Sequence, residues 1–117
     1  MASIRLMAQP PLAKQLAVAD VTFAPGESDS FHKHPVQEEI IYVVTGELEH
    51  WLDQKKQMLG PGDGIFIPAN TVHALFNTTN GETKFLAIFG PSVGDTGWER
   101  VNVFDDEPWR TLRPISN

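Results

Sequence analysis

The sequence predicts an all-β protein: a small barrel or jelly roll made of eight or more short strands. Nine glycines and nine prolines are spread among the 117 residues, mostly between short segments rich in β-branched and aromatic side chains. No segment of ten or more residues repeats its apolar side chains at a convincing helical spacing. A barrel or jelly roll also removes the exposed sheet edges that a chain of this size would otherwise carry.

Turn residues divide the chain into seven candidate strands. The clearest is EIIYVV at residues 39–44, which ends at Thr45-Gly46 and forms a hairpin with the next strand. Asn80-Gly81 favours a two-residue hairpin turn, because both positions tolerate positive φ. One short N-terminal helix is expected within residues 8–17. The candidate strands are residues 16–24, 39–44, 47–52, 57–59, 64–67, 72–77 and 84–89.

The length fits one domain that covers residues 1–117. The segment 94–117 mixes tryptophans and valines with acids, and we expect it to pack outside the barrel or on a partner subunit. A formal net charge of −6 argues against a nucleic acid partner. No run approaches the ~18–20 apolar residues that span a membrane, and the N-terminus lacks the apolar core of a secretory signal, so we expect a cytoplasmic protein.

Two polar clusters, at residues 26–46 and 62–77, interrupt the apolar pattern. His32 and His34 are two residues apart, so on an extended strand both imidazoles point to the same face. Glu39 opens an apolar strand, where a buried, unpaired carboxylate would cost several kcal/mol (~2–5) unless it has a partner. His73 lies in another apolar strand.

These four residues together predict a metal site. A single histidine in an apolar strand is more often a hydrogen-bonded core residue than a ligand, but three histidines and a carboxylate flanked by turn glycines are a rare coincidence. The chain has no cysteine, so nitrogen and oxygen donors must hold the ion. We therefore expect His32, His34, Glu39 and His73 to bind one divalent transition metal: Fe, Mn, Ni, Co or Zn.

The two clusters resemble the two motifs of the cupin superfamily. Residues 26–46 match G(x)5HxH(x)3–4E(x)6G at every defined position when Glu39 is the acid, whereas Glu38 leaves seven residues before Gly46 and would point to the opposite face. Residues 62–77 match G(x)5PxG(x)2H(x)3N except that Asn70 replaces a glycine, and asparagine tolerates the left-handed backbone best among the other residues. The resemblance implies the cupin double-stranded β-helix fold and its metal site.

The activity follows less directly from the resemblance. The pattern is similar to single-domain cupins of the quercetin-dioxygenase-like group, which favours a metalloenzyme that acts as a dioxygenase on a small, oxygenated, chelating substrate. Metal-assisted isomerase or lyase chemistry on a sugar or keto acid, and a non-catalytic binder of metal or small ligands, are the alternatives. Cupins often pair through sheet faces, so we expect a homodimer.

Beyond the metal centre no catalytic residue is assigned. His50 could act behind the ligands as an acid or base, but a surface or packing role is the stronger interpretation. We expect the Asn77 side chain to stabilise a turn by hydrogen bonding. Apolar side chains should line the barrel interior and exclude water from the metal; the candidates are Phe23, Phe31, Ile41, Val43, Ile65, Ile67, Leu75, Phe85, Ile88 and Phe89.

Overall fold

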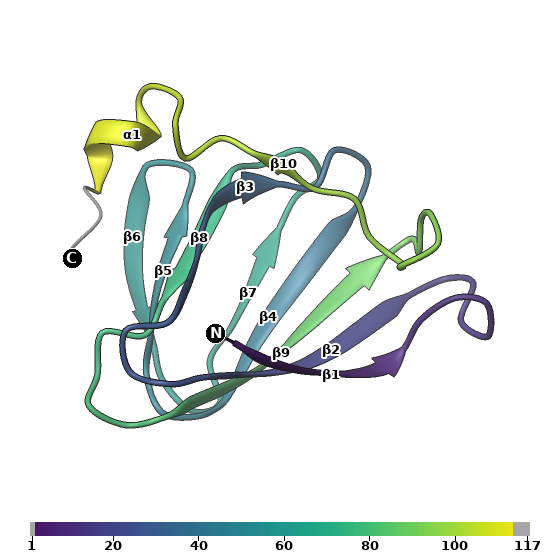
Figure 1. Ribbon diagram of the computed structural model, residues 1–117, viewed down its shortest axis with the longest axis horizontal. Coiled ribbons are helices and arrows are strands. Elements are labelled where there is room, and N and C mark those ends of the chain that lie inside the picture. The colour runs from purple at the N-terminus through teal and green to yellow at the C-terminus, as the bar shows by residue number, and fades with distance from the viewer. Residues whose placement is uncertain (1, 114–117) are drawn as a thin grey trace.

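The computed structural model describes residues 2–113 as two five-stranded antiparallel sheets that face each other (Figure 1). The first sheet, sheet A, has the order β1-β2-β9-β4-β7, and the second, sheet B, has the order β10-β3-β8-β5-β6. The strands are β1 Ser3–Ala8, β2 Ala17–Phe23, β3 Ser28–Lys33, β4 Glu38–Thr45, β5 Leu48–Leu52, β6 Lys55–Leu59, β7 Gly64–Ile67, β8 His73–Phe76, β9 Thr83–Gly90 and β10 Val101–Asn102. The predicted all-β jelly roll is confirmed.

Side chains alternate along the strands as a half-buried sheet requires. In β4 the buried positions are Glu39, Ile41 and Val43, while the residues between them are exposed. Their apolar partners come from both sheets, so the main core fills the space between the layers. This core contains Ala17, Ala19, Val21, Phe23, Ile41, Val43, Leu48, Leu59, Ile67, Leu75, Phe85, Ala87 and Phe89.

The predicted N-terminal helix is wrong. Residues 3–8 form β1, an edge strand that pairs with β2, and residues 9–16 form turns and bends. One backbone hydrogen bond from Ala13 to Gln9 closes a turn there. Pro10 and Pro11 each disfavour helical backbone at the residue before them, so this turn does not continue as a helix.

The predicted hairpin turn at Asn80-Gly81 is also wrong. The strands on either side of it, β8 and β9, belong to different sheets, so residues 77–82 cross from one layer to the other. Asn77 holds this connection, as predicted for its side chain. Its amide donates hydrogen bonds to the carbonyls of Phe23 and Gly81, at 3.0 and 2.8 Å.

The C-terminal segment contacts sheet A through the Trp98 side chain and adds a strand to sheet B. Trp98 lies in the barrel mouth, where its ring stacks on Phe89 at 5.6 Å, and β10 extends sheet B beside β3 (Figure 1). Beyond it, the short helix α1, Trp109–Leu112, packs against the outer cluster around Phe31. The segment expected to pack outside the barrel thus supplies part of its mouth, and its residues 114–117 lie outside the described residues.

Four motif positions adopt the left-handed backbone. Gly26, Gly46 and Gly62 have φ between +80° and +87°, and Asn70, which stands where the cupin motif has glycine, has φ +61°. Asparagine therefore serves at this turn as the sequence predicts. Among the described residues, no helix has the length and apolar character needed to cross a bilayer.

Candidate metal centre

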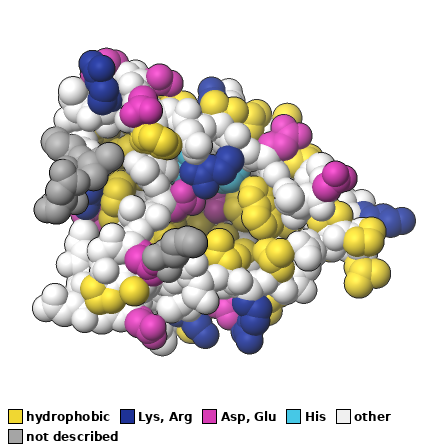
Figure 2. All heavy atoms as spheres, viewed as in Figure 1, with side chains coloured by type: hydrophobic (Ala, Val, Ile, Leu, Met, Phe, Trp, Pro, Cys, Tyr) yellow, Lys and Arg dark blue, Asp and Glu magenta, His cyan; other side chains and the backbone are white. Residues whose placement is uncertain are grey.

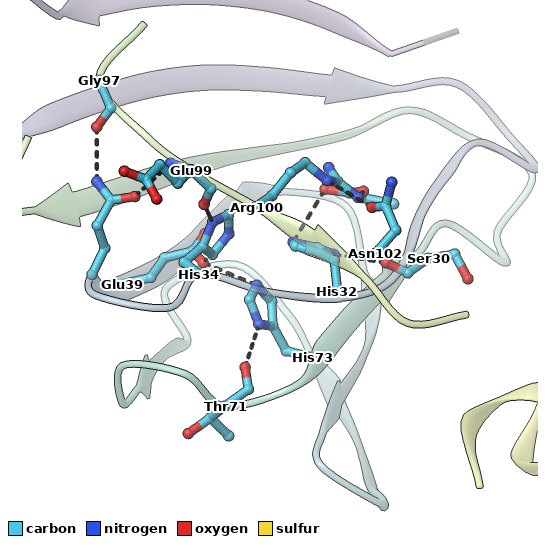
Figure 3. Close-up of polar contacts among 12 residues, drawn as sticks. Ser30, His32, His34, Glu39, Thr71, His73, Gly97, Glu99, Arg100 and Asn102 are labelled. Carbon is cyan, nitrogen blue, oxygen red and sulfur yellow. Dashed lines mark hydrogen bonds and ion pairs between the residues drawn. The ribbon is translucent and has the colours of Figure 1, made fainter. Parts of the chain in front are cut away.

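The structure brings the four predicted ligands together at one end of the barrel interior. His32 lies near the end of β3 and pairs directly with His73, the first residue of β8, so their rings are 4.2 Å apart. His34 follows β3, and Glu39 reaches in from β4 of the opposite sheet. All four side chains are buried. The candidate nitrogens of the three histidines lie within 4.8 Å of one another (Figure 3).

Backbone carbonyls fix the orientation of each imidazole. The Nδ1 atoms of His32, His34 and His73 donate hydrogen bonds to the carbonyls of Ser30, Glu99 and Thr71, at 2.6, 2.6 and 3.1 Å (Figure 3). A carbonyl can only accept, so Nδ1 carries the proton and the Nε2 lone pair is available to an ion. This arrangement is how proteins orient metal-binding histidines.

Glu39 lies beside two of the three histidines. Its Oε1 atom lies 3.0 Å from His73 Nε2 and 3.3 Å from His34 Nε2. Adjacent ligands at about 2.1 Å from an ion and at right angles to each other would be about 3 Å apart, which these distances match. Its neighbour Glu38 is exposed. Glu39, as predicted, is the acid that faces inward.

The charge of Glu39 and the charges of the neighbouring histidines influence one another's pKa values. Burial alone would raise the pKa of Glu39, but the adjacent imidazoles of His34 and His73 outweigh it and lower the pKa to about 2. Burial alone would lower the pKa of His73, but the same carboxylate outweighs it and raises the pKa. Burial lowers the pKa of His32 to about 4, although the charge of Asp29 opposes it. His32 is therefore neutral at pH 7, as a metal ligand must be.

The donor atoms of this cluster fit a cation. His34 Nε2, His73 Nε2 and Glu39 Oε1 are buried and have no hydrogen bond of good geometry. Buried polar atoms are normally satisfied, and lone pairs that converge on one point repel each other without a positive charge between them. The cluster is thus compatible with a metal ion.

A largely apolar pocket of about 230 Å³ opens onto the cluster. Figure 2 shows a hollow with hydrophobic walls, with histidine beside it and charged side chains at its rim. The walls include Ala2, Ile4, Ala19, Val21, Phe23, Ile41, Leu75, Phe85, Ala87, Phe89 and Trp98. Of the predicted lining, Phe23, Ile41, Leu75, Phe85 and Phe89 are in this wall, whereas Phe31 belongs to the outer cluster.

Two charged residues at the mouth were missed by reasoning from the sequence. Asp29 Oδ2 lies 3.6 Å from His32 Nε2, and Asp29 Oδ1 accepts a hydrogen bond of 2.9 Å from Arg100 Nη2. Residues 29 and 32 would point to opposite faces of a regular strand. A β-bulge between them adds one residue to β3, so both face the interior. No local sequence signal marks this bulge, and Arg100 lies outside both motifs.

His50 lies behind the ligands and away from the surface. It is fully buried, and its ring stacks on that of His73 with centroids 6.2 Å apart. Burial lowers the pKa of His50 to about 4. The surface role considered for it is wrong, whereas the packing role agrees with its position.

Comparison with known proteins agrees with this geometry. The family model described as "Cupin domain" matches residues 19–89, which is more than half of the chain. The chain is a cupin. Among solved structures, this cupin resembles KdgF from Halomonas sp., with a TM-score of 0.72, 28% identity, and coverage of 80% of this chain and 82% of that one.

Curated relatives of this cupin carry varied names. Protein SchB of Streptomyces halstedii is 39% identical over 67 residues, which are 57% of this chain and 49% of that protein. Quercetin 2,3-dioxygenase of Bacillus subtilis is 32% identical over 62 residues, 53% of this chain but 18% of the enzyme. The chain thus spans about half the length of SchB and less of the dioxygenase.

Proposed function

We propose that this cupin is a mononuclear metalloenzyme in which His32, His34, Glu39 and His73 hold one divalent transition metal that binds a small, oxygenated, chelating substrate. The observation that carries the proposal is that buried histidine Nε2 atoms and the carboxylate of Glu39 converge in the barrel interior. The Nδ1 atoms of the same histidines already donate hydrogen bonds to backbone carbonyls. The nitrogen and carboxylate oxygen donors of this set suit a divalent transition metal.

The chain's own residues would shape the reaction in three ways. His32, His34, Glu39 and His73 would hold the ion, which would act as a Lewis acid toward the oxygen atoms of the substrate. The apolar walls exclude water from the centre and orient the carbon skeleton of the substrate. The charge of Glu39 lowers the net charge of the centre to +1 beside three neutral imidazoles.

Dioxygenase chemistry on a flavonol-like or enediol substrate is the first candidate reaction. It is supported by the match with quercetin 2,3-dioxygenase and by the largely apolar pocket beside the nitrogen and carboxylate donors.

Isomerase or lyase chemistry on a sugar or keto acid is the second candidate. It is favoured by the similarity to KdgF, which extends over 80% of this chain, and by a 29% identity over 80 residues with the KdgF of Dickeya dadantii, which is named a pectin degradation protein. The match with the dioxygenase covers 53% of this chain. A binder without turnover is the remaining alternative, and its centre would be coordinatively saturated.

The test begins with elemental analysis of protein purified without chelators or a nickel column, and about one equivalent of divalent transition metal per chain is expected. Protein loaded separately with Fe, Mn and Ni is then given flavonols, enediols, keto sugars and keto acids. Oxygen uptake supports the first reaction, and product without oxygen uptake supports the second. Absence of bound metal would overturn the proposal, and bound metal without turnover would leave the binder.

A further inference from the structure

The pocket mouth carries a second recognition element next to the ligand cluster. Apart from Glu39, the charged side chains of its lining are Asp29 and Arg100, set against apolar walls. They pair with each other at 2.9 Å. Their side chains are about one-third exposed, 35% and 37%, so both remain within reach of a molecule that enters from solvent.

Two neighbours hold the Arg100 guanidinium in place. Its Nε atom donates a 2.9 Å hydrogen bond to Asn102 Oδ1, and Nη2 donates to Asp29. Asn102 in turn is paired with His32 across β10 and β3. In Figure 3 the guanidinium lies beside Asn102. A planar, permanently charged fork in this position can bind a carboxylate through two parallel hydrogen bonds.

The Asp29 carboxylate shows where such a group would lie. It bridges Arg100 and the metal-facing side of His32, at 2.9 and 3.6 Å. A substrate that chelates an ion at the cluster would therefore bring a neighbouring carboxylate to the guanidinium. A neutral flavonoid would leave the guanidinium without a new partner.

We propose that the pocket selects substrates that carry a carboxylate in addition to their metal-binding oxygens, and that Arg100 binds this carboxylate in the place that Asp29 occupies. The inference rests on the proposed function, because the chelating end of the substrate needs the metal. Asp29 is then an internal competitor that keeps the guanidinium oriented until an acid of suitable shape displaces it.

The test uses two probes that differ in one charge: protocatechuate and its methyl ester, which share a chelating catechol. Binding to the Ni-loaded protein is measured by anaerobic titration calorimetry. A charge-assisted hydrogen bond predicts that the acid binds about tenfold or more tightly than the ester. Arg100→Gln should remove this preference, and Arg100→Lys should retain part of it.

Asp29→Asn should act in the opposite direction, because it removes the competitor and its negative charge. The affinity for the acid should rise, and the affinity for the ester should stay the same. Arg110→Gln is the matched control: it deletes an exposed arginine that pairs with Glu107 away from the pocket, so the preference should persist.

The outcomes separate this inference from the metal site itself. Equal affinities of the wild-type protein for acid and ester, or weaker acid binding by Asp29→Asn, would overturn the inference while leaving the metal site intact. If neither probe binds the Ni-loaded protein, the proposed chelating function fails and this inference fails with it. The wild-type comparison decides even if an Arg100 variant does not fold, and metal stoichiometry is measured for every variant.

Discussion

Single side chains decide the chemistry of this centre because each ligand is fixed twice, by its strand and by a second contact of its ring or carboxylate. Each of the three histidines donates a hydrogen bond from Nδ1 to a backbone carbonyl. Glu39 reaches them from the other sheet. The site therefore depends on the two layers keeping their relative position, and a change in one acid should affect binding without moving the histidines.

The two adjacent acids of β4 provide a test of this point. Glu39→Gln removes a buried negative ligand, and Glu38→Gln changes an exposed residue one position away. Loss of a residue that merely supports a ligand costs about 10- to 100-fold in metal affinity, so Glu39→Gln should lose at least about tenfold. Competition with a chromophoric chelator measures this. Similar affinities of the two variants would remove Glu39 from the ligand set.

A second acid, Glu49, links Arg113 to the barrel and should make the stability of the protein depend on pH. Burial alone would raise the pKa of Glu49, but hydrogen bonds from Arg113 and Trp51 outweigh it and lower the pKa below 4.5. A lowered folded-state pKa stabilises the protein above the unfolded pKa and loses this contribution as the pH falls through the folded value.

Glu49→Gln should therefore lower the free energy of unfolding at pH 7 and have a smaller effect well below pH 4 (about the unfolded pKa or lower). Urea unfolding of metal-free protein at both pH values measures the difference, with exposed Glu47→Gln as the control. A loss that is the same at both pH values would contradict the role of the Glu49 charge.

Motif spacing was sufficient to predict which four side chains converge, but it could not predict the residues that face them. Two histidines at i and i+2 share a face on any extended strand, so His32 and His34 follow from local geometry. Asp29 reaches the same face only because of a bulge, and Arg100 lies immediately before the two-residue strand β10. Both depend on pairing between segments that are distant in sequence.

At the scale of elements, strands with a local burial pattern were predicted, and features that depend on long-range pairing were missed. Strands with buried alternating side chains, such as β4, were predicted. The edge strand β1 was missed because five of its six residues are exposed and no burial pattern marks it. The connection after Asn77 was mistaken for a hairpin because the Asn-Gly signal is local, whereas the choice of sheet is made by strand order.

The turn between β4 and β5 gives a prediction at this scale. Gly46 has φ +80°, and a Cβ there would lie 2.5 Å from the Glu82 carbonyl oxygen and 2.7 Å from Thr83 Oγ1. Gly62 has a similar φ of +87°, but a Cβ would meet nothing within 4 Å. Alanine would be strained at both positions, and only Gly46 adds a collision with backbone of the neighbouring strand.

Gly46→Ala should therefore destabilise the protein by at least about 1 kcal/mol more than Gly62→Ala, since forced overpacking costs about 1–3 kcal/mol. Urea denaturation of the two variants, at fixed metal content, measures the gap. Equal losses would mean that the strands separate at this turn without cost, and the close approach would not constrain the fold.

At the scale of the whole molecule, the outer face of sheet A carries a group of exposed apolar side chains. Ile40, Tyr42 and Phe66 are 43%, 42% and 51% exposed. The register places Ile40 between Phe66 and Ile88, so the patch is continuous across β7, β4 and β9. A continuous apolar patch of this kind can pair with its own copy about a two-fold axis.

The predicted homodimer should use this face. Light scattering should give about twice the chain mass of 13.0 kDa, and Ile40→Lys should shift the protein to monomer because it places two charges at the interface. Leu12→Lys, at an exposed position outside the patch, should leave the mass unchanged. A wild-type mass of one chain would contradict the prediction.

Metal binding should also govern the stability of the whole barrel, because the ligands come from both sheets and their inner atoms are unsatisfied without a cation. Binding to the folded state alone adds RT ln(1 + [L]/Kd), about 2.7 kcal/mol at a free metal concentration 100 times Kd. The melting temperature should thus fall when a chelator removes the ion and recover when the ion returns. Glu39→Gln should reduce the response to metal, while Glu38→Gln should retain it. Calorimetry at matched pH measures the change. If elemental analysis shows bound metal but its removal leaves the melting temperature unchanged, the ion lies outside the space between the two sheets.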